Sequence, residues 1–369
     1  MNILVTGAAG FIGRNLCVFL QEAGFDNIEK ITLEDSEDGI AEKVNAADFI
    51  FHLAGINRPE NDEEFKKGNT DLTQNIIDTL VKNGRKTPIL LTSSIQAELS
   101  NPYGASKAGA EQAVSAYSQV TGAATYIYRL PNVFGKWSRP NYNSAVATFC
   151  YNTINDLPIT IHNPDSALSL VYIDDVCQSF VSMLTSTPDV TEQYRFVQPV
   201  YETTVGDVVS LLTEFKESRE SMVSAKVGEG FIRALYSTYV SHLAPDQFSY
   251  SVTRHSDERG TFVEMLKTKD SGQFSFFTAH VGITRGGHYH HTKTEKFLVI
   301  NGRALFKFRH ITSGESYELV VVGEESRIVE TVPGWSHDIT NIGDNELVVM
   351  LWANEIFDRE NPDTVNFKV

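Results

Sequence analysis

The sequence predicts an α/β domain with a doubly wound parallel sheet, followed by a smaller all-β domain. The chain has 369 residues, which exceeds the length of one average domain and makes two domains the natural expectation. As far as about residue 243, short apolar strands alternate with helices, an order typical of a parallel sheet with helices on both faces. Beyond residue 250, short strands separated by glycines indicate an antiparallel barrel or jelly roll. We therefore predict the α/β domain over 1–243, a linker over 244–250 and the all-β domain over 251–369.

The composition is that of a soluble acidic enzyme. A net charge of −16 argues against a nucleic-acid surface, and no apolar run is long enough to cross a bilayer. The first residues form a strand and lack the charged, then apolar, layout of a secretory signal. Cys17, Cys150 and Cys177 are scattered and form no CxxC pair, as suits a reducing compartment. We expect a cytoplasmic protein that neither binds nucleic acid nor inserts into a membrane.

A glycine-rich turn joins the first strand to the first helix. Gly7, Gly10 and Gly13 stand at this turn, and an apolar-periodic helix begins near Phe11. Glycines allow a tight turn and a close approach of a pyrophosphate, to which the helix N-terminus offers free N–H groups. The turn predicts a dinucleotide site, with a purely structural glycine turn as the alternative.

Two cues near this turn disagree about the dinucleotide. A second strand over 30–33 ends in Glu34 and Asp35, and an acidic residue there favours NAD by binding the ribose hydroxyls. Arg14 directly follows the last glycine and would favour NADP by meeting a 2′-phosphate. The residues alone leave both cofactors open.

Two further strands lead into small and hydroxyl residues. The strand over 48–55 ends in Leu53, Ala54 and Gly55, and its small last residues would let a cofactor lie across its carboxyl end. The buried strand over 88–91 runs into Thr92, Ser93 and Ser94. The alternation of these strands with helices indicates a parallel, doubly wound sheet.

A tyrosine and a lysine follow at a spacing of four. Tyr103 and Lys107 fall on a predicted helix that starts near Pro102, so both side chains lie on one face. A nearby ammonium favours tyrosinate, which would let the phenol exchange a proton with a substrate oxygen near neutral pH. Ser94 would supply a second hydrogen bond to that oxygen. The alternative is a chance pair on an exposed helix.

These motifs resemble the extended short-chain dehydrogenase/reductase family, which has a Rossmann-type fold. The resemblance covers Met1 to about Leu243 and rests on Ser94 and on segments 6–13, 48–55, 103–107, 129–135 and 170–176. It implies hydride transfer between a nicotinamide and a carbon of a nucleotide sugar, with Ser94, Tyr103 and Lys107 as the catalytic set. The cofactor contacts that it implies are Gly7, Gly10, Phe11, Ile12, Gly13, Arg14, Leu53, Ala54, Gly55, Tyr103 and Lys107.

The substrate side of this domain carries fewer signals. By the same resemblance Asn132 contacts the substrate, and Asp174-Asp175 belongs to a structural element near the substrate lobe. Trp137, Arg139 and Arg195 are candidate contacts for a diphosphate or a uridine, and a surface position is the alternative for each of them.

The second domain holds seven of the ten histidines of the chain. We predict its strands over 261–266, 273–281, 296–300, 304–308 and 347–351. His288 and His290 alternate on one strand and so share a face, while Glu295 returns from the next strand and His337 comes later. Three imidazoles and a carboxylate suit a divalent ion, with Zn²⁺ favoured and Fe, Mn or Ni as alternatives. A histidine-rich surface loop is the other interpretation.

This second domain resembles the cupin family. The first cupin motif, G(x)5HxH(x)4E(x)6G, is matched at every position from Gly282 to Gly302. The second motif departs from the family pattern, because Pro-Gly replaces Pro-x-Gly before His337 and Arg327 replaces a glycine. Residues 257–264 and 285–288 are similar to cupin epimerases that act on 4-keto-6-deoxy nucleotide sugars. The order of the two domains resembles bifunctional enzymes of capsular polysaccharide synthesis.

These resemblances imply an epimerase coupled to a reductase. A hydrogen beside a ketone is acidic and one beside an alcohol is not, so epimerisation must come first. The cupin domain would invert C3 of a UDP-linked 4-keto-6-deoxy-N-acetylhexosamine. The reductase domain would then reduce C4 with NADPH to a UDP-2-acetamido-2,6-dideoxy-L-talose-type product, a precursor of UDP-N-acetyl-L-fucosamine. The residues near the metal motif that could act as the base are Tyr289, His291, Lys296 and Asp338.

Several alternatives stay open at this point. The metal could be structural rather than catalytic. The chain could be a single-activity reductase with the cupin as a dimerisation module, or a sensor without turnover. A homodimer through the cupin domain is expected under either enzymatic reading.

Overall fold

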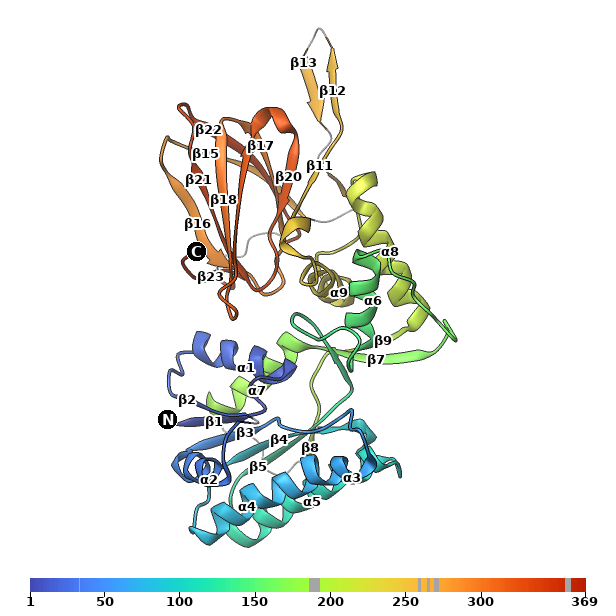
Figure 1. Ribbon diagram of the computed structural model, residues 1–369, viewed down its shortest axis with the longest axis vertical. Helices are drawn as coiled ribbons and strands as arrows, with labels where there is room; N and C mark the ends of the chain where they lie inside the picture. The colour runs from blue at the N-terminus through green and yellow to red at the C-terminus, as the bar shows by residue number, and fades with distance from the viewer. Residues whose placement is uncertain (33, 186–192, 258–259, 264–265, 269–271, 356–359) are drawn as a thin grey trace. The chain divides into compact units, whose positions relative to one another are not determined.

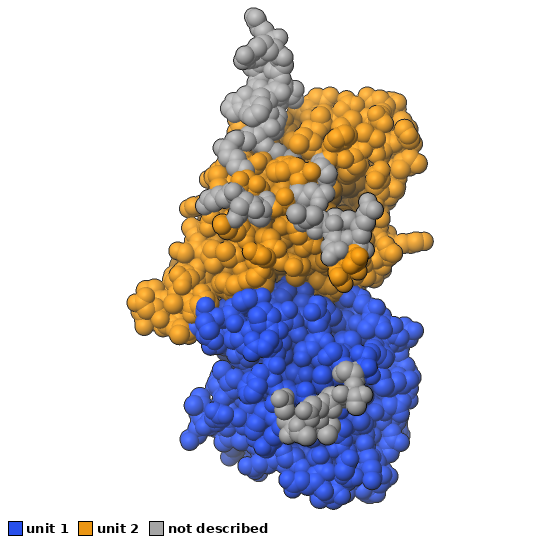
Figure 2. All heavy atoms as spheres, turned by 180° about the vertical axis from the view of Figure 1, so that it is seen from behind, with its two compact units in different colours: residues 1–134, 141–144, 168–202 blue, residues 135–140, 145–167, 203–369 orange. Residues whose placement is uncertain are grey.

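The structure is a computed structural model that describes residues 1–369 except 33, 186–192, 258–259, 264–265, 269–271 and 356–359 (Figure 1). The chain forms two compact units, coloured in Figure 2. The first contains residues 1–134, 141–144 and 168–202, and the second contains 135–140, 145–167 and 203–369. The second unit thus joins the all-β region to helices that lie before residue 243. The boundaries at 243 and 251 stay predictions about the sequence domains.

A parallel six-stranded sheet forms the centre of the first unit, in the order β2-β1-β3-β4-β5-β8. Its strands are β1 (Ile3–Thr6), β2 (Ile28–Ile31), β3 (Phe49–His52), β4 (Ile89–Ser94), β5 (Thr125–Leu130) and β8 (Tyr194–Arg195). This order confirms the predicted doubly wound sheet. The second strand starts two residues earlier than predicted, and Leu33, its predicted end, lies outside the described residues.

Helices cover both faces of this sheet (Figure 1). One face carries α1 (Phe11–Glu22) and α7 (Ile173–Thr185), which pack against each other. The other carries α2 (Glu37–Ala46), α4 (Leu72–Lys82) and α5 (Pro102–Thr121), and the short α3 (Asp62–Phe65) precedes α4. The start of α5 is well specified, because the side chain of Asn101 accepts a hydrogen bond from Gly104 N at 2.7 Å and Pro102 occupies the first turn.

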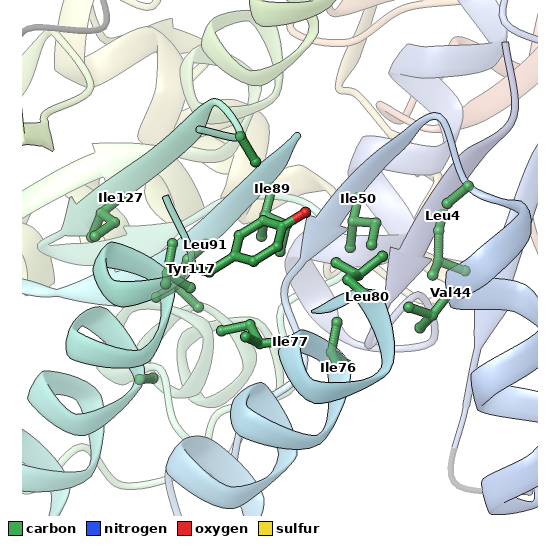
Figure 3. Close-up of a cluster of buried hydrophobic side chains, with 14 of the residues drawn as sticks. Leu4, Val44, Ile50, Ile76, Ile77, Leu80, Ile89, Leu91, Tyr117 and Ile127 are labelled. Atoms are coloured by element: carbon green, nitrogen blue, oxygen red, sulfur yellow. The ribbon is translucent and has the colours of Figure 1, made fainter. Parts of the chain in front are cut away.

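The core between this sheet and α4 and α5 is mostly aliphatic and includes the ring of Tyr117 (Figure 3). Strand residues such as Leu4, Ile50 and Ile89 face the side chains of Ile76 and Leu80 on α4. Strands β1, β3 and β4 are buried on both faces, which explains why they appear as continuous apolar runs in the sequence. This core fixes the strand ends from which the candidate site is built.

Two five-stranded sheets form the all-β part of the second unit, in the orders β11-β20-β17-β22-β15 and β19-β18-β21-β16-β23. The first contains β11 (Ser249–Ser251), β15 (Gln273–Ala279), β17 (Glu295–Asn301), β20 (Arg327–Glu330) and β22 (Leu347–Ala353). The second contains β16 (Thr284–Tyr289), β18 (Arg303–His310), β19 (Ser316–Val322), β21 (Trp335–Asn341) and β23 (Val365–Asn366). All described pairings in the two sheets are antiparallel, as predicted.

Short strands and three helices complete the described part of the chain. The strands are β6 (Asn132–Phe134), β7 (Ala167–Tyr172), β9 (Val200–Thr204), β10 (Val223–Ser224), β12 (Arg254–Asp257), β13 (Gly260–Val263) and β14 (Lys267–Thr268). The predicted strand over 261–266 corresponds to β13, and residues 264–265 lie outside the described residues. The helices are α6 (Ala145–Ile154), α8 (Val205–Ser221) and α9 (Gly230–Val240).

Helices α8 and α9 bind the jelly roll through buried polar contacts within the second unit. Arg219 pairs with Glu330, which also pairs with Lys296, and Ser237 Oγ donates to Thr292 O at 2.8 Å. Burial makes such contacts specific, because each unpaired group would be costly. Among the described residues no helix is both long and apolar enough to cross a membrane.

Candidate functional site

The glycine turn packs too tightly for side chains. Gly7 has φ = +66°, and a Cβ there would lie 2.8 Å from the Ala54 backbone. A Cβ at Gly13 would lie 2.3 Å from Gly7 O. The turn therefore requires glycine at both positions, and it places the N-terminus of α1 beside the residues that follow β3. Arg14 is partly buried on the first turns of α1, and burial lowers its pKa.

The end of β3 is fixed to β1 by a hydroxyl. Thr6 Oγ1 accepts hydrogen bonds from Leu53 N at 3.1 Å and Ala54 N at 3.0 Å, and it contacts the Nδ1 atom of His52 at 2.7 Å. Gly55 follows, and a Cβ there would lie 3.1 Å from Lys107 Nζ. The structure thus brings the predicted small residues, the glycine turn and the predicted catalytic lysine to one edge of the sheet.

The predicted catalytic residues also meet at this edge. Ser94 ends β4, and its side chain forms a hydrogen bond with the phenol of Tyr103 on α5. Lys107 Nζ donates to Thr92 O at 3.2 Å and lies 6.0 Å from the centroid of the Tyr103 ring. A serine and a tyrosine that share a hydrogen bond are arranged to bind one substrate oxygen together.

The charges of this set correct one prediction. Burial raises the pKa of Tyr103, partly offset by the hydrogen bond with Ser94, whereas the spacing of Tyr103 and Lys107 predicts that the ammonium lowers this pKa. The ammonium is directed at the Thr92 carbonyl, and its own pKa falls to about 8 through burial, opposed by Glu111. The phenol is therefore protonated at neutral pH and can donate that proton.

Asn69 is a site residue that sequence reasoning missed. It lies in a π-helical turn, Lys66–Asp71, a distortion that often marks functional sites. Its Oδ1 accepts from Ile56 N at 3.0 Å, and its Nδ2 donates to Ile56 O and to Ser106 Oγ, each at 2.9 Å. Asn69 therefore ties the loop after β3 to α5, the helix that carries Tyr103 and Lys107. No periodicity in the sequence signals a π-helical turn.

A buried ion pair anchors α5 from the other side. Glu111 binds Arg129 through both carboxylate oxygens, at 2.9 and 2.8 Å, and accepts a hydrogen bond from Ser93 Oγ at 2.5 Å. Glu111 stands one turn after Lys107, and Ser93 directly precedes Ser94. This contact keeps the helix that carries Tyr103 and Lys107 in register with β4 and β5.

The four predicted substrate contacts have different surroundings. Asn132 is exposed on β6, where its Nδ2 lies 3.5 Å from Ser169 O, and Arg139 is exposed in the second unit. Arg195 lies over the ring of Tyr126, 5.4 Å from its centroid. Trp137 has φ = +69° and packs on the jelly roll 5.7 Å from His310. The side chains of Arg195 and Trp137 thus already pack against other residues of the protein.

The four predicted metal ligands come together in the jelly roll. The candidate ligand atoms of His288, His290, Glu295 and His337 all lie within 4.8 Å of one another. The Nε2 atoms of His290 and His337 lie 3.2 and 3.4 Å from Glu295 Oε2. His290, Glu295 and His337 are buried, and His288 is partly buried.

A bulge in β16 creates this convergence. Gly286 and Gly287 adopt φ values of +106° and +81°, and the register between β16 and β21 shifts between Gly286 and His288. The shift sets His288 directly opposite His337. A Cβ at Gly286 would lie 2.8 Å from His337 O, so the glycine is required for this close approach.

The protonation states differ among the four residues of the cluster. Burial would lower the pKa of His290, but the hydrogen bond with Glu295 and the charge of Glu295 outweigh it and raise this pKa. Burial, followed by the charges of His337 and His290, lowers the pKa of His288 to about 3. Burial also lowers the pKa of His337. It would raise the pKa of Glu295, but the hydrogen bonds from His290 and His337 outweigh it and hold this pKa well below its usual range. His337 Nδ1 is buried and has no hydrogen-bond partner among the described residues. An ionised carboxylate among imidazoles is a donor set that fits a divalent ion such as Zn²⁺.

The four predicted base candidates lie outside this cluster. Tyr289 alternates to the other face of β16, where it packs against His291 at 5.5 Å between ring centroids. Lys296 is buried and paired with Glu330, and Asp338 alternates away from His337 on β21. Burial raises the pKa of Asp338.

Lys293 and Asp363 are the residues at the cluster that sequence reasoning missed. Lys293 Nζ lies 3.0 Å from Glu295 Oε1 and is buried. The backbone oxygen of Asp363 accepts a hydrogen bond from His290 Nδ1. Asp363 is separated from His290 by 73 residues, and a contact at that separation leaves no local signal in the sequence.

Comparison with known proteins gives two family matches. Residues 3–195 match the NAD dependent epimerase/dehydratase family, and residues 255–365 match the polysaccharide biosynthesis C-terminal domain. These two segments contain the two predicted sites.

Full-length relatives are found among both curated proteins and solved structures. UDP-2-acetamido-2,6-beta-L-arabino-hexul-4-ose reductase from Pseudomonas aeruginosa is 58% identical over 364 residues, which cover 99% of this chain and 98% of the relative. The crystal structure of the capsular polysaccharide assembling protein CapF from Staphylococcus aureus has 40% identity and a TM-score of 0.68, with full coverage of both chains. UDP-glucuronic acid 4-epimerase from Bacillus cereus, in complex with NAD, shares the fold over 58% of this chain and 82% of its own, with 20% identity and a TM-score of 0.53.

Proposed function

The chain belongs to the NAD dependent epimerase/dehydratase family, and we propose that it epimerises and then reduces one nucleotide sugar at two sites. It is an enzyme of the nucleotide-sugar reductase and epimerase type in polysaccharide synthesis. The proposed substrate is a UDP-linked 4-keto-6-deoxy-N-acetylhexosamine, inverted at C3 and then reduced at C4. The proposed product is of the UDP-2-acetamido-2,6-dideoxy-L-talose type, a precursor of UDP-N-acetyl-L-fucosamine.

The observation that carries this proposal is the presence of two complete chemical sets in one chain. Ser94, Tyr103 and Lys107 meet at the sheet edge, and a three-histidine, one-glutamate cluster is buried in the jelly roll. A reductase needs only the first set. The second set suits the removal of a proton beside a ketone, which must happen before that ketone becomes an alcohol.

The reductase step uses the phenol as a proton donor. NADPH, when bound, would supply the hydride that goes to C4. Tyr103 donates its proton to the ketone oxygen O4, because burial keeps the phenol protonated, and Ser94 binds the same oxygen. Lys107, beside Gly55, would hold the nicotinamide ribose and balance the phenolate that remains.

NADPH is proposed over NADH on the surroundings of the second strand. Asp35, one of the two acidic residues that argued for NAD, is already bound to Lys43 and to Thr32 N at 2.8 Å. A carboxylate with these partners is less available to a ribose, and Lys43 adds a cation at this strand end. Arg14 stands on the first turns of α1 and would meet a 2′-phosphate.

The epimerase step is assigned to the metal cluster. His288, His290, Glu295 and His337 would hold the ion, for which Zn²⁺ is proposed, and such an ion polarises a ketone and so acidifies the adjacent C3 proton. Transfer of this proton to a basic group of the site leaves negative charge on the sugar oxygen. Delivery of a solvent-derived proton to the opposite face then inverts C3 and would introduce deuterium in D₂O. Lys293 carries a buried ammonium at the cluster and would favour that negative charge.

We also propose that the enzyme is a homodimer formed through the jelly roll. β15 is an edge strand of its sheet, and it exposes Phe274 and Phe276, which are 47% and 70% accessible. Aromatic side chains on an edge strand invite pairing with another chain. A second copy would cover both the apolar face and the strand edge.

A proton NMR time course in D₂O tests this function. The enzyme is given the UDP-linked 4-keto sugar first without and then with NADPH. We expect deuterium at C3 before NADPH is added and reduction at C4 only afterwards.

The competing function is that of a single-activity reductase with the jelly roll as a dimerisation module. It is favoured by the name of the Pseudomonas aeruginosa relative, which mentions a reductase alone. Reduction in the NMR experiment without any exchange at C3 would establish this alternative and contradict the proposed epimerase.

A further inference from the structure

Residues 363–367 form a strap across β16, the strand that carries His288. β23 pairs antiparallel with β16, with Asn366 opposite His288 and Val365 opposite Tyr289. Phe367 N donates to Gly287 O at 2.8 Å, and Phe367 O accepts from Ser336 Oγ. The strap therefore contacts both strands that supply histidines.

At the start of this strap, the carboxylate of Asp363 closes over the loop between two predicted ligands. Its Oδ1 accepts from His291 N at 2.8 Å, and its Oδ2 accepts from Thr292 N at 2.7 Å and Lys293 N at 2.6 Å. The hydroxyl of Thr292 donates to Oδ2 as well, at 3.0 Å. Successive N–H groups that converge on one anion form a strong, charge-assisted site, which fixes the path of the loop from His290 to Glu295.

The backbone of the same residue fixes one ring. A carbonyl oxygen only accepts, so the contact between His290 Nδ1 and Asp363 O requires the proton on Nδ1. The Nε2 atom is then directed toward Glu295 Oε2, at 3.2 Å, on the side of the cluster. A carboxylate only accepts, so the ring holds protons on both nitrogens while Glu295 is its partner, and the Nε2 proton is released when a cation binds there. A metal-binding histidine whose second nitrogen donates to a carbonyl has its tautomer and orientation set by that partner.

We propose that Asp363 is a positioning residue of the metal centre. Its carboxylate holds the loop that delivers His290 and Glu295, and its carbonyl holds the His290 ring with Nε2 toward the ion. The ligand class is a divalent cation bound by nitrogen and oxygen donors. The inference rests on the metal centre proposed above, and it adds a residue that carries no metal-binding motif.

The test measures metal affinity in the full-length protein. Metal-free wild type, Asp363→Asn and the matched control Asp344→Asn, an exposed carboxylate on the same domain, are titrated with Co²⁺ and with Zn²⁺. Visible absorption reports the ligand field of Co²⁺, and competition with a chromophoric chelator gives the affinities. We expect Asp363→Asn to weaken binding by about 10- to 100-fold and to change the Co²⁺ spectrum, while Asp344→Asn matches wild type.

Unfolding of the metal-free proteins separates positioning from folding. A purely structural role would lower the stability of the metal-free variant and leave the affinity of its folded fraction unchanged, and that result would overturn the proposal. If Asp363→Asn does not fold, Asp363→Glu carries the same test, because it keeps the charge and displaces the oxygens. Equal affinity in wild type, Asp363→Asn and His290→Ala would instead show that the metal centre itself is absent.

Discussion

At the scale of single residues, the proposed reductase site contains a buried cation, Lys107, that lowers the stability of the fold. Lys107 is buried with its charge, and burial lowers its pKa from 10.5 to about 8. A cation with a depressed pKa opposes folding at neutral pH, because the unfolded state holds the same proton at lower cost. A cost of this kind is expected where the role proposed for a side chain competes with stability.

Replacing Lys107 with Met should therefore stabilise the metal-free, cofactor-free protein while abolishing reduction at C4. We expect the free energy of unfolding to increase by on the order of 1–2 kcal/mol at pH 7. This increase is smaller than the free energy that corresponds to the full pKa shift, because the hydrogen bond to Thr92 O and the attraction of Glu111 are lost. Between pH 8 and 10.5 the unfolded wild type binds more protons than the folded one, so wild-type stability rises and the difference shrinks. Denaturant unfolding at pH 7 and pH 9.5 measures both effects, with the exposed Lys82→Met as control. A loss of stability at pH 7 would contradict the assigned cost of the buried charge.

At the scale of elements, the sequence predicted strands and helices well where the signal was local. The turn between β1 and α1 was confirmed, and so was the strand predicted over 88–91, which as β4 extends to Ser94, because each depends on a spacing within about ten residues. His288 lies on β16 as predicted, but this strand ends at Tyr289 and His290 directly follows it. The bulge at Gly286, the π-helical turn of Asn69 and the strap with Asp363 depend on contacts across the fold. Such contacts leave no periodicity in the chain, so the ligands could be predicted and their positioning partners could not.

The edge strand β15 supports a prediction about assembly. Replacing Phe276 with Glu places a charge on the proposed dimer face, so we expect a shift from dimer to monomer. Light scattering coupled to size-exclusion chromatography measures the mass of the variant. Val320→Glu is the control, because Val320 is also exposed on an edge strand, β19 of the other sheet. A dimer that survives Phe276→Glu and dissociates with Val320→Glu would place the interface on the other sheet.

At the scale of the whole molecule, the compact units cut across the two predicted sequence domains. Helices α8 and α9 precede the jelly roll in sequence and join it in one unit through Arg219, Ser237 and Glu330. The change from alternating helices and strands to strands alone predicted the change of fold near residue 243. This change did not predict that α8 and α9 pack with the jelly roll in one compact unit. Polar side chains hold these helices to the jelly roll, and such contacts leave no pattern in the sequence.

The central claim is that one chain carries two separate active sites, and a complementation experiment tests it most directly. Tyr103→Phe removes the proton donor at C4 and should still exchange the C3 proton, whereas His290→Ala removes a ligand and should still reduce sugar that is already epimerised. Each variant alone should fail to convert the 4-keto sugar to the final product with NADPH, and an equimolar mixture should convert it, as followed by NMR. Failure of the mixture, with both variants folded, would contradict the account, as would loss of both activities in Tyr103→Phe.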